Sequence, residues 1–441
     1  MGEKLRVRRS RRLRQTTLLL GCCLALYCLF FISRSPVQNG PLATWKPWTL
    51  PPELLSNLSL NEEQCNAAFP GLTKEIDDAV ALGPFTLKQT GDSGPVQGRI
   101  KDGQLYIIHA QRRADLSTEM LNSRTAALHQ LHRALLTSPT PLPNTLFSLN
   151  FQDSPFGTSW TYSRPADPSQ SSLTARNFLM PHFSFWSWPL PFIGSFPRAA
   201  SAITSIESSL SFADKIPKAV WRGTAWFNSV HNPRLRQNLL KAARERTWDW
   251  ADIEALRWEG GNATNAVRVE DFCRWRYVVH TEGIAYSGRF QFLQMCGSVV
   301  VTTPIVWMQH TTHLVRPVWS GQLLEGKPGE KDGEWKLSER MKRAWPREYG
   351  PEEANIVFVK PDWSDLEDVI GWLEGHVDVA EGIAKRQRDL FVGGGYFSPV
   401  AEVCYWRALV RGWAQVVKTD GEGWEEQQGV SFETFALNNG D

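Results

Sequence analysis

The sequence predicts an α/β protein in which helices flank parallel sheets and one membrane-spanning helix precedes them. Short apolar runs such as 298–303 (SVVVTT) alternate with longer stretches in which apolar residues recur every three or four positions. This alternation is typical of the strands and helices of parallel sheets. A separate apolar run near the N-terminus suits a bilayer. At roughly 150 residues per domain, the 441 residues suggest two or three domains.

The N-terminus is expected to anchor the chain in a membrane. Basic residues crowd positions 1–15, and the apolar run TTLLLGCCLALYCLFFI follows within 16–33. An apolar helix of about 17–25 residues crosses a bilayer, and the preceding basic residues place the N-terminus in the cytosol. The alternative is a cleaved signal peptide, but no small-residue cleavage site follows. We therefore expect a single-pass type II protein of the Golgi or endoplasmic reticulum membrane with a luminal remainder.

Cysteines and glycosylation sequons fit an oxidising lumen. Four cysteines lie beyond the apolar run: Cys65, Cys273, Cys296 and Cys404. An even number permits two disulfides. N-glycosylation sequons occur at Asn57 and Asn262. The net charge is +2, and the remainder is mildly acidic without the basic tail, which argues against nucleic acid as a partner.

The luminal chain divides into regions of different composition. Residues 34–70 are rich in Pro, Ser and Leu and are predicted to form a stem. A first α/β domain is expected over 71–215, with strands at 104–109 and 144–151 and a helix at 115–136.

A second α/β domain is expected over 216–398. Its predicted strands are 218–221, 276–281, 298–303 and 356–359, and its predicted helices are 232–246, 290–296 and 364–390, the last with a capping box. The charged stretch 321–354 is predicted to be a surface insertion, and a last helix begins the segment 399–441.

The stretch 278–301 (VVHTEGIAYSGRFQFLQMCGSVVV) carries a candidate anion site. Ser287, Gly288 and Arg289 fall where a strand's loop meets the next predicted helix, whose N-terminal N–H groups and dipole attract phosphate. Gly288 lets a ligand approach the backbone, and Arg289 offers a planar fork for a diphosphate. The alternative is an ordinary turn with a surface arginine.

A second candidate anion site lies earlier in the chain, where a predicted strand is followed by a glycine turn and a cluster of basic residues. Arg222, Gly223 and Thr224 end a strand, and Arg234 and Arg236 begin the next helix. Two such turns can converge at the carboxyl ends of neighbouring strands, where open sheets bind ligands. The alternative is that these arginines solvate a helix.

A carboxylate and an aromatic run mark the first domain. Asp153 follows a strand, where it suits a general base, although Asp-Ser-Pro is also a common turn starter. The chain has 20 tryptophans, and aromatic faces suit sugar binding, although core packing is their commoner use. Phe185 and Trp186, in the run with the most aromatic residues, are expected to line an acceptor cleft.

The sequence contains neither Asp-x-Asp nor zinc-spaced ligands, so no metal or other cofactor is expected.

In order, these motifs resemble glycosyltransferase family 90, which includes fungal capsule-associated glycosyltransferases and animal protein O-glucosyltransferases of the Rumi type. The resemblance runs from about Leu142 to Val417, excluding 321–354. It rests on Asp153-x-Pro155, Trp186, Trp221-Arg222-Gly223, Cys273-x-x-x-Tyr277, Gly283, Ser287-x-Arg289-Phe290, Cys296-Gly297-Ser298, Trp307 and Cys404-Tyr405-Trp406.

The resemblance implies a GT-B-like pair of Rossmann-like domains facing a cleft. It implies inverting, metal-independent transfer of xylose or glucose from a UDP-sugar donor to a hydroxyl of a glycan or protein acceptor. Asp153 matches the catalytic base. The implied donor-binding residues are Arg222, Gly223, Thr224, Arg234 or Arg236, Ile284, Ala285, Tyr286, Ser287, Gly288 and Arg289.

The resemblance also implies the disulfides Cys273–Cys296 and Cys65–Cys404. The chain departs from the family pattern before Trp307, where the usual acidic residue is missing. Two rival functions stay open at this point. One is a glycoside hydrolase that uses Asp153 and Glu282 as a carboxylate pair, and the other is a non-catalytic carbohydrate-binding or scaffold protein.

Overall fold

The computed structural model describes residues 50–91, 94–170, 176–325, 338–419, 421, 423–424 and 427–438. The predicted cytosolic tail, membrane anchor and first part of the stem (34–49) lie outside this set. Among the described helices, none has both the length and the apolarity to cross a membrane. Residues 47–441 form one compact unit, and the predicted α/β class is confirmed.

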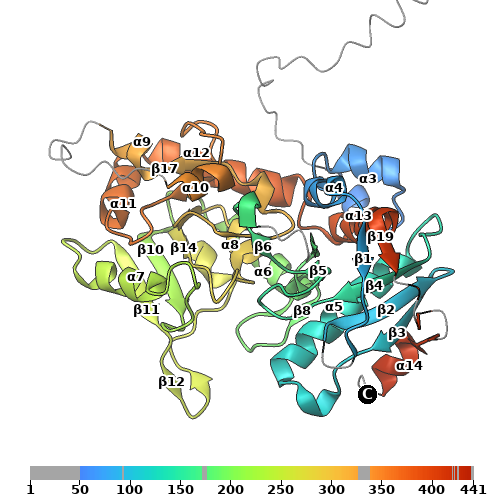
Figure 1. Cartoon of the computed structure of the whole chain (residues 1–441). Helices are drawn as coiled ribbons and strands as arrows, with labels where there is room; N and C mark the ends of the chain where they lie inside the picture. The colour runs from blue at the N-terminus through green and yellow to red at the C-terminus, as the bar shows by residue number, and fades with distance from the viewer. Residues whose placement is uncertain are drawn as a thin grey trace, which may run out of the picture. The chain divides into compact units, whose positions relative to one another are not determined.

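A six-stranded parallel sheet forms the C-terminal half of this unit, in the order β11-β10-β14-β15-β18-β17 (Figure 1). Its strands are β10 (Ile216–Gly223), β11 (Ala251–Ala255), β14 (Trp275–His280), β15 (Val299–Thr302), β17 (Pro317–Trp319) and β18 (Ile356–Phe358). Every residue of β15 is buried, as expected where helices cover both faces of a parallel sheet. Parallel pairing brings the carboxyl ends of β10, β14 and β15 to one edge.

Three helices pack against this sheet: α7 (Leu235–Arg244), α11 (Leu366–Gly375) and α12 (Val377–Arg388). The prediction of one continuous helix over 364–390 is wrong, because the chain breaks at His376 between α11 and α12. The expected capping box is absent, since Glu367 accepts hydrogen bonds from Thr247 instead.

The sheet of the N-terminal half is mixed, in the order β20-β3-β2-β4-β5-β7. Its strands are β2 (Val96–Lys101), β3 (Gln104–His109), β4 (Thr145–Leu149), β5 (Ser159–Thr161), β7 (Asn177–Leu179) and β20 (Val430–Ser431). Only β4, β5 and β7 pair in parallel, so the expectation of a parallel Rossmann-like sheet holds for half of its strands. The Asp102-Gly103 turn has positive φ at both residues, which makes a tight hairpin and forces β2 and β3 to run antiparallel.

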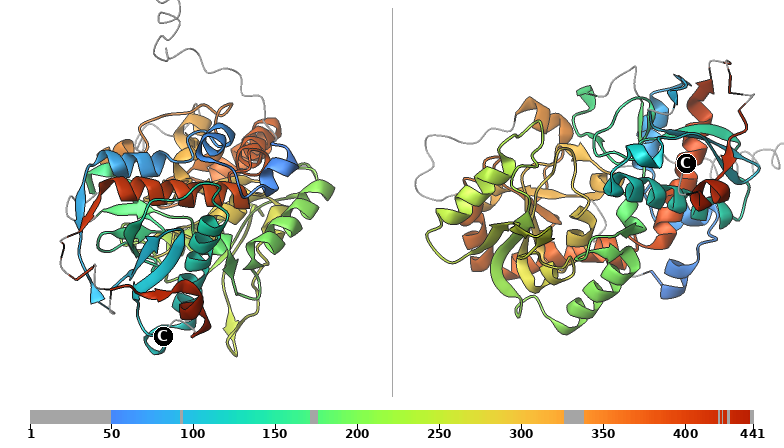
Figure 2. Two further views of the ribbon diagram at one scale, coloured as in Figure 1. Left: turned by 90° about the vertical axis from the view of Figure 1, so that its right-hand side faces the viewer. Right: turned by 90° about the horizontal axis from the view of Figure 1, so that it is seen from below.

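The C-terminal segment returns to the N-terminal half. Helix α13 (Pro399–Val416) packs against α4 (Lys74–Ala81) and α5 (Thr118–Leu136), and the red and blue elements lie side by side in Figures 1 and 2. Strand β19 (Val417–Thr419) pairs with β1 (Phe85–Leu87), and β20 pairs with β3. The two ends of the described chain therefore complete one hydrophobic core.

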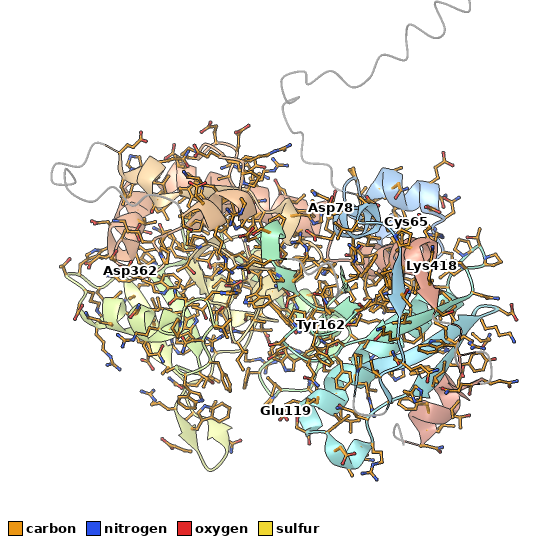
Figure 3. All side chains as sticks on the ribbon, viewed as in Figure 1. Cys65, Asp78, Glu119, Tyr162, Asp362 and Lys418 are labelled. Atoms are coloured by element: carbon orange, nitrogen blue, oxygen red, sulfur yellow. A yellow bond between two sulfur atoms is a disulfide. The ribbon has the colours of Figure 1, made fainter. Side chains whose placement is uncertain are left out.

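Part of the predicted stem belongs to this core. Helices α2 (Pro52–Ser56) and α3 (Glu62–Ala68) occupy its last twenty residues, and Leu60 and Phe69 are each only 1% exposed. Cys65 on α3 forms a disulfide with Cys404 on α13 (Cys65 is labelled in Figure 3). The stem prediction is therefore wrong from residue 50 onward, because its leucine and phenylalanine side chains pack inside.

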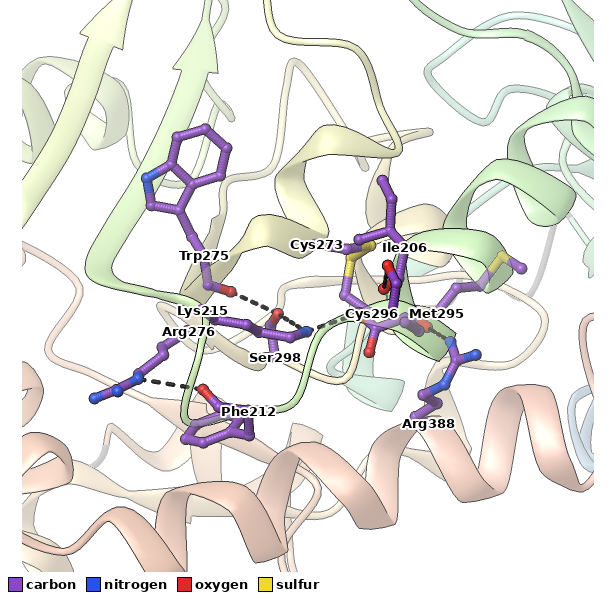
Figure 4. A network of polar contacts seen from close by, with 12 residues as sticks. Ile206, Phe212, Lys215, Cys273, Trp275, Arg276, Met295, Cys296, Ser298 and Arg388 are labelled. Atoms are coloured by element: carbon purple, nitrogen blue, oxygen red, sulfur yellow. Dashed lines mark hydrogen bonds and ion pairs between the residues drawn. A yellow bond between two sulfur atoms is a disulfide. The ribbon is translucent and has the colours of Figure 1, made fainter.

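A second disulfide and a buried ion pair hold both ends of the segment 273–298 (Figure 4). Cys273 bonds to Cys296, so both implied disulfides are present. Buried Lys215 donates to Glu207 Oε1 (2.7 Å) and Ser298 Oγ (3.0 Å), and Ser298 Oγ donates to the Trp275 carbonyl (2.6 Å). These contacts hold the starts of β14 and β15 together. They therefore also hold both ends of the segment that contains the loop between the two strands.

Replacing Cys65 and Cys404 together by serine should lower the free energy of unfolding by about 2–5 kcal/mol. The bond joins residues 339 apart in sequence, so its loss frees a very long loop in the unfolded chain. Thermal unfolding followed by circular dichroism measures the effect. The matched control is the Cys273→Ser/Cys296→Ser pair, which spans only 23 residues and should destabilise less. An unchanged melting temperature in the first variant would contradict this role.

Candidate functional site

Two arginines, buried Arg236 and half-buried Arg289, lie near each other at the carboxyl edge of the parallel sheet. Arg236, in the first turn of α7, donates from Nε to the Glu282 carbonyl (3.2 Å) and from Nη1 to the Thr224 carbonyl (2.8 Å). Arg289, after the loop that follows β14, donates to the Arg222 carbonyl and lies 5.9 Å from the Phe272 ring. Among the described residues, neither guanidinium forms an ion pair with a carboxylate.

The electrostatics of this pair favour an anion. Burial lowers the pKa of Arg236 to about 9, with the charge of Arg289 as a second cause, and burial lowers the pKa of Arg289 to about 10. Neighbouring His280 is fully buried, and burial followed by the two arginine charges brings its pKa to about 3. Buried cations without a counter-ion are costly, so a bound anion would relieve this cost.

The structure separates the other predicted arginines from this pair. Arg222 uses four of its five N–H groups on protein partners, because it bonds to the Asp252 carboxylate (2.7 Å) and to the carbonyls of Asp252, Trp221 and Asn265. It fastens β10 to β11, which is a structural role beyond the donor contact that was predicted for it. Arg234 is exposed at the N-cap of α7. Of the two competing residues, Arg236 is therefore the one that lies in the site.

The loop 281–289 connects β14 to the short helix α8 (Phe290–Gln294). Tyr286 and Ala285 are buried, Ser287 is half-buried, and Ile284 is 44% exposed. The predicted helix start is confirmed, because α8 begins at Phe290 with Arg289 as its N-cap, but the helix has only five residues. So short a helix has little dipole, which leaves the arginine side chains as the source of positive charge.

The two glycines have packing roles. A Cβ at Gly288 would lie 2.5 Å from the His182 ring and 2.9 Å from Trp188, both of the N-terminal half. A Cβ at Gly223 would lie 2.5 Å from the Trp221 ring. Gly288 is therefore needed where the two halves touch, not to admit a ligand as predicted.

Asp153 faces this loop from the other sheet. Strands β4, β5 and β7 run in parallel, so their carboxyl ends share one edge, and Asp153, Tyr162 and His182 follow these strands in turn. Asp153 is exposed, yet desolvation by surrounding protein raises the pKa of its carboxyl. Burial, followed by the charge of Asp153, raises the pKa of Tyr286 well above its usual value. The predicted base and the predicted donor loop are thus neighbours.

Two buried side chains near Asp153 were not anticipated. His182 Nδ1 accepts the Ser184 backbone N–H (3.1 Å), so the ring proton resides on Nε2, and burial holds its pKa well below the usual value. Tyr162 is 1% exposed and hydrogen-bonds Ser123 (Tyr162 is labelled in Figure 3). The three-residue strands β5 and β7 are too short for periodicity to reveal, so their ends gave no signal.

Glu282 links the arginines to the neighbouring loop. Its Oε1 accepts the backbone N–H groups of Val306 (3.0 Å) and Trp307 (2.8 Å), and burial, only partly offset by these bonds, raises its pKa to about 8. Its carbonyl holds Arg236. Glu282 therefore supplies a carboxyl to the backbone at Trp307, where the family's usual acidic residue is missing.

The predicted acceptor-cleft residues are packed. Phe185 is 6% exposed and contacts the rings of Phe196, His310 and Phe397. Trp186 stacks on His129 at 5.3 Å, and Arg133 lies 4.8 Å from its ring. Phe185 is therefore not free to line a cleft, whereas Trp186 is half-buried and its acceptor role stays a prediction.

Both sequon asparagines are exposed, Asn57 after α2 and Asn262 in the hairpin strand β13 (Asn262–Ala263). Figure 1 shows this hairpin, labelled β12 (Trp258–Glu259), projecting from the surrounding ribbon. Each position is accessible to a modifying enzyme.

Comparison with known proteins now identifies the class: the protein is a glycosyltransferase. Residues 86–320, more than half of the chain, match Glycosyl transferase family 90, and the chain belongs to this family. It is similar to protein O-glucosyltransferase 1 of Rattus norvegicus, with 21% identity over 89% of this chain and 92% of the relative. It is also similar to protein O-glucosyltransferase 1 of Bos taurus (22%; 71% and 72%) and to the O-glucosyltransferase rumi homolog of Aedes aegypti (23%; 55% and 54%).

Replacing Arg236 by alanine should weaken the binding of UDP about 10- to 100-fold, because a charge-assisted contact to phosphate is lost. The matched control is Arg234→Ala, two residues earlier and exposed, which should bind UDP as the wild type does. Isothermal titration calorimetry of the full chain measures both affinities. Equal loss in the two variants would show that the pair Arg236 and Arg289 is not the anion site.

Proposed function

We propose that the protein transfers glucose or xylose from a UDP-sugar to a hydroxyl of a glycan or protein acceptor, with inversion and without a metal ion. The observation that carries this proposal is the pair Arg236 and Arg289, without a carboxylate partner in the described part of the chain, set near Asp153. The names of the similar proteins, which are O-glucosyltransferases, favour glucose.

In the proposed reaction Asp153 is the general base. Its carboxylate takes the proton of the acceptor hydroxyl while that oxygen forms a bond to C1 of the sugar. The bond from C1 to the diphosphate oxygen breaks on the opposite face, and UDP leaves with the electron pair. Arg236 and Arg289 stabilise the charge that develops on the leaving diphosphate. Attack opposite to the leaving group converts an α-linked donor into a β-linked product.

Tyr286 is a candidate contact for the reacting groups. Its hydroxyl is buried and has no hydrogen-bond partner in the described structure, and it neighbours Asp153. A buried hydroxyl without a hydrogen-bond partner costs free energy. A substrate hydroxyl bound beside Tyr286 would supply the missing partner.

Arginines would replace a metal at the diphosphate. The group of metal-ligating side chains found in the described regions is Glu207, Cys273 and Cys296, but the two cysteines are joined in a disulfide. Their thiolates are not free for an ion, and the group lies at the start of β14 and β15, at the edge opposite to the arginines.

We propose a GT-B-like division of labour between the two sheets. The parallel sheet would hold the donor at the carboxyl ends of β10 and β14, and the mixed sheet would present Asp153 toward the acceptor. The location proposed is the membrane of the Golgi or endoplasmic reticulum. It rests on the apolar run at 16–33 and on two disulfides, which suit an oxidising lumen.

The rival hydrolase has little support. A glycosidase needs a second carboxyl that reaches the sugar. Glu282 is 4% exposed, and one of its oxygens is occupied by two backbone N–H groups, so it is poorly placed to pair with Asp153.

UDP release tests the reaction and the base together. The full chain in detergent, with EDTA, should release UDP from one of UDP-glucose, UDP-xylose or UDP-galactose when an acceptor is supplied. Asp153→Asn should lower this rate at least 100-fold, from the loss of general-base catalysis, while UDP affinity stays near that of the wild type. Near-normal turnover in Asp153→Asn would refute the base, and activity lost in EDTA would refute metal independence.

The pH profile gives an independent test of Asp153. Because the base acts ionised, kcat/KM should fall as pH drops through its pKa, and desolvation places that pKa above the ordinary value of about 3.9. Glu282, with a pKa raised to about 8, is the carboxyl that the rival hydrolase would use, so Glu282→Gln serves as the control and should keep the acid limb. A profile without an acid limb above pH ~4 would contradict the raised pKa of the base.

A further inference from the structure

Helix α10 (Glu339–Ala344) forms one wall of a pocket of about 200 Å³ beside the arginine pair. The helix lies beyond the family-matched residues 86–320 and within the stretch predicted to be a surface insertion. That prediction fails here, because Trp345 is only 8% exposed and donates from Nε1 to the Ile305 carbonyl (2.9 Å). The insertion therefore contributes a built wall to the site.

Ion pairs and hydrogen bonds hold α10 against both halves of the protein. Arg343 grips the buried Asp167 carboxylate with two bonds (3.1 and 2.8 Å). Arg340 donates to Gln170 Oε1 (3.0 Å) in the N-terminal half and to His231 Nδ1 (3.0 Å) in the loop after β10. Asp167 also lines the pocket, but Arg343 and Ser169 donate to both of its carboxylate oxygens, so its main role is to hold α10.

Besides Asp167 and Ser338, the polar side chains that line the pocket include the hydrogen-bond donors Arg340 and His231. Because His231 Nδ1 accepts from Arg340, its proton lies on Nε2, and burial followed by the Arg340 charge lowers its pKa and keeps it neutral. Arg340 bonds only to neutral partners among the described residues. Trp345, Met341 and Ile305 supply an apolar floor. Donors above an apolar, partly aromatic floor suit a hydroxylated ring.

The pocket is connected to the anion site through two residues, Val306 and Glu282. Val306 lines the pocket and donates its N–H to Glu282 Oε1, while the Glu282 carbonyl accepts from Arg236. The walls come mostly from loops of the parallel sheet, with Ala166 of the N-terminal half closing one side. A volume of about 200 Å³ is below the roughly 300–1,000 Å³ of pockets for larger ligands, so it fits one ring.

We propose that this pocket binds the sugar ring of the donor, and that Arg340 and His231 donate hydrogen bonds to its hydroxyls and so determine which sugar is accepted. The proposal rests on the proposed function, because it places the ring next to a diphosphate held by Arg236 and Arg289. It makes helix α10, which lies outside the family-matched residues, a determinant of donor choice.

The test separates the sugar's contribution from that of UDP. Calorimetry on the full chain, with EDTA, gives dissociation constants for UDP, UDP-glucose and UDP-xylose. Arg340→Ala, His231→Ala and the pocket-filling Ala344→Phe should each weaken the cognate UDP-sugar about tenfold, from lost hydrogen bonds or lost space, and should leave UDP unchanged. Lys342→Ala is the control, because Lys342 is exposed and bonds only to Glu339 on the same helix.

The outcomes are distinct. A UDP-sugar to UDP affinity ratio that changes in the three pocket variants and not in Lys342→Ala supports the proposal. The same ratio in all proteins overturns it, as does a higher acceptor KM with an unchanged donor ratio, which would assign the pocket to the acceptor. If UDP fails to bind the wild type, the proposed function fails first, and the proposal fails with it.

Discussion

The site depends on two guanidinium groups that lie near each other inside the protein. Neither has a carboxylate partner among the described residues. Arg236 and Arg289 bond to the backbone carbonyls of Thr224, Glu282 and Arg222, which carry only partial negative charge. Desolvating an unpaired ion costs several kcal/mol, and burial lowers the pKa of both residues accordingly. The surrounding strands and loops hold the two side chains in place. A bound diphosphate would offset the free-energy cost of their desolvation.

The scaffold around the pair is correspondingly rigid. The strand β14, its loop and α8 are closed at their base by the Cys273–Cys296 disulfide and by the buried Lys215 contacts. At the other end, Glu282 ties the loop to the backbone of Trp307, and Gly288 abuts His182 of the mixed sheet. Donor loop and base are therefore positioned by contacts between the two halves, not by the loop alone.

Sequence patterns predicted the parts of the fold that depend on local regularity. The alternation of strand and helix predicted the parallel sheet, and the family resemblance implied both disulfides, which are present. In the mixed sheet, strands 104–109 and 144–151 were predicted, but β5 and β7 are only three residues long and gave no periodicity, so the mixed order of the sheet could not be predicted. Residues 50–70 looked like a stem because composition does not show that Leu60 and Phe69 pack against distant elements.

Side-chain roles were harder to predict than positions. Arg222 and Arg236 look equivalent in sequence, and only the neighbouring Asp252 decides that Arg222 is structural. Phe185 and Trp186 looked like a sugar platform, but the rings of Phe196, His310 and Phe397 enclose Phe185, and His129 stacks on half-buried Trp186. The pocket beside α10 was hidden for the same reason, since its walls come from segments more than 100 residues apart in sequence.

The account's central claim is that Arg236 and Arg289 together hold the diphosphate of the donor. A crystal structure of the chain with UDP and EDTA tests it most directly. The account predicts diphosphate oxygens within hydrogen-bond distance of both guanidinium groups, with the arginine side chains close to their present positions. UDP bound elsewhere, or contacting neither arginine, would contradict the account.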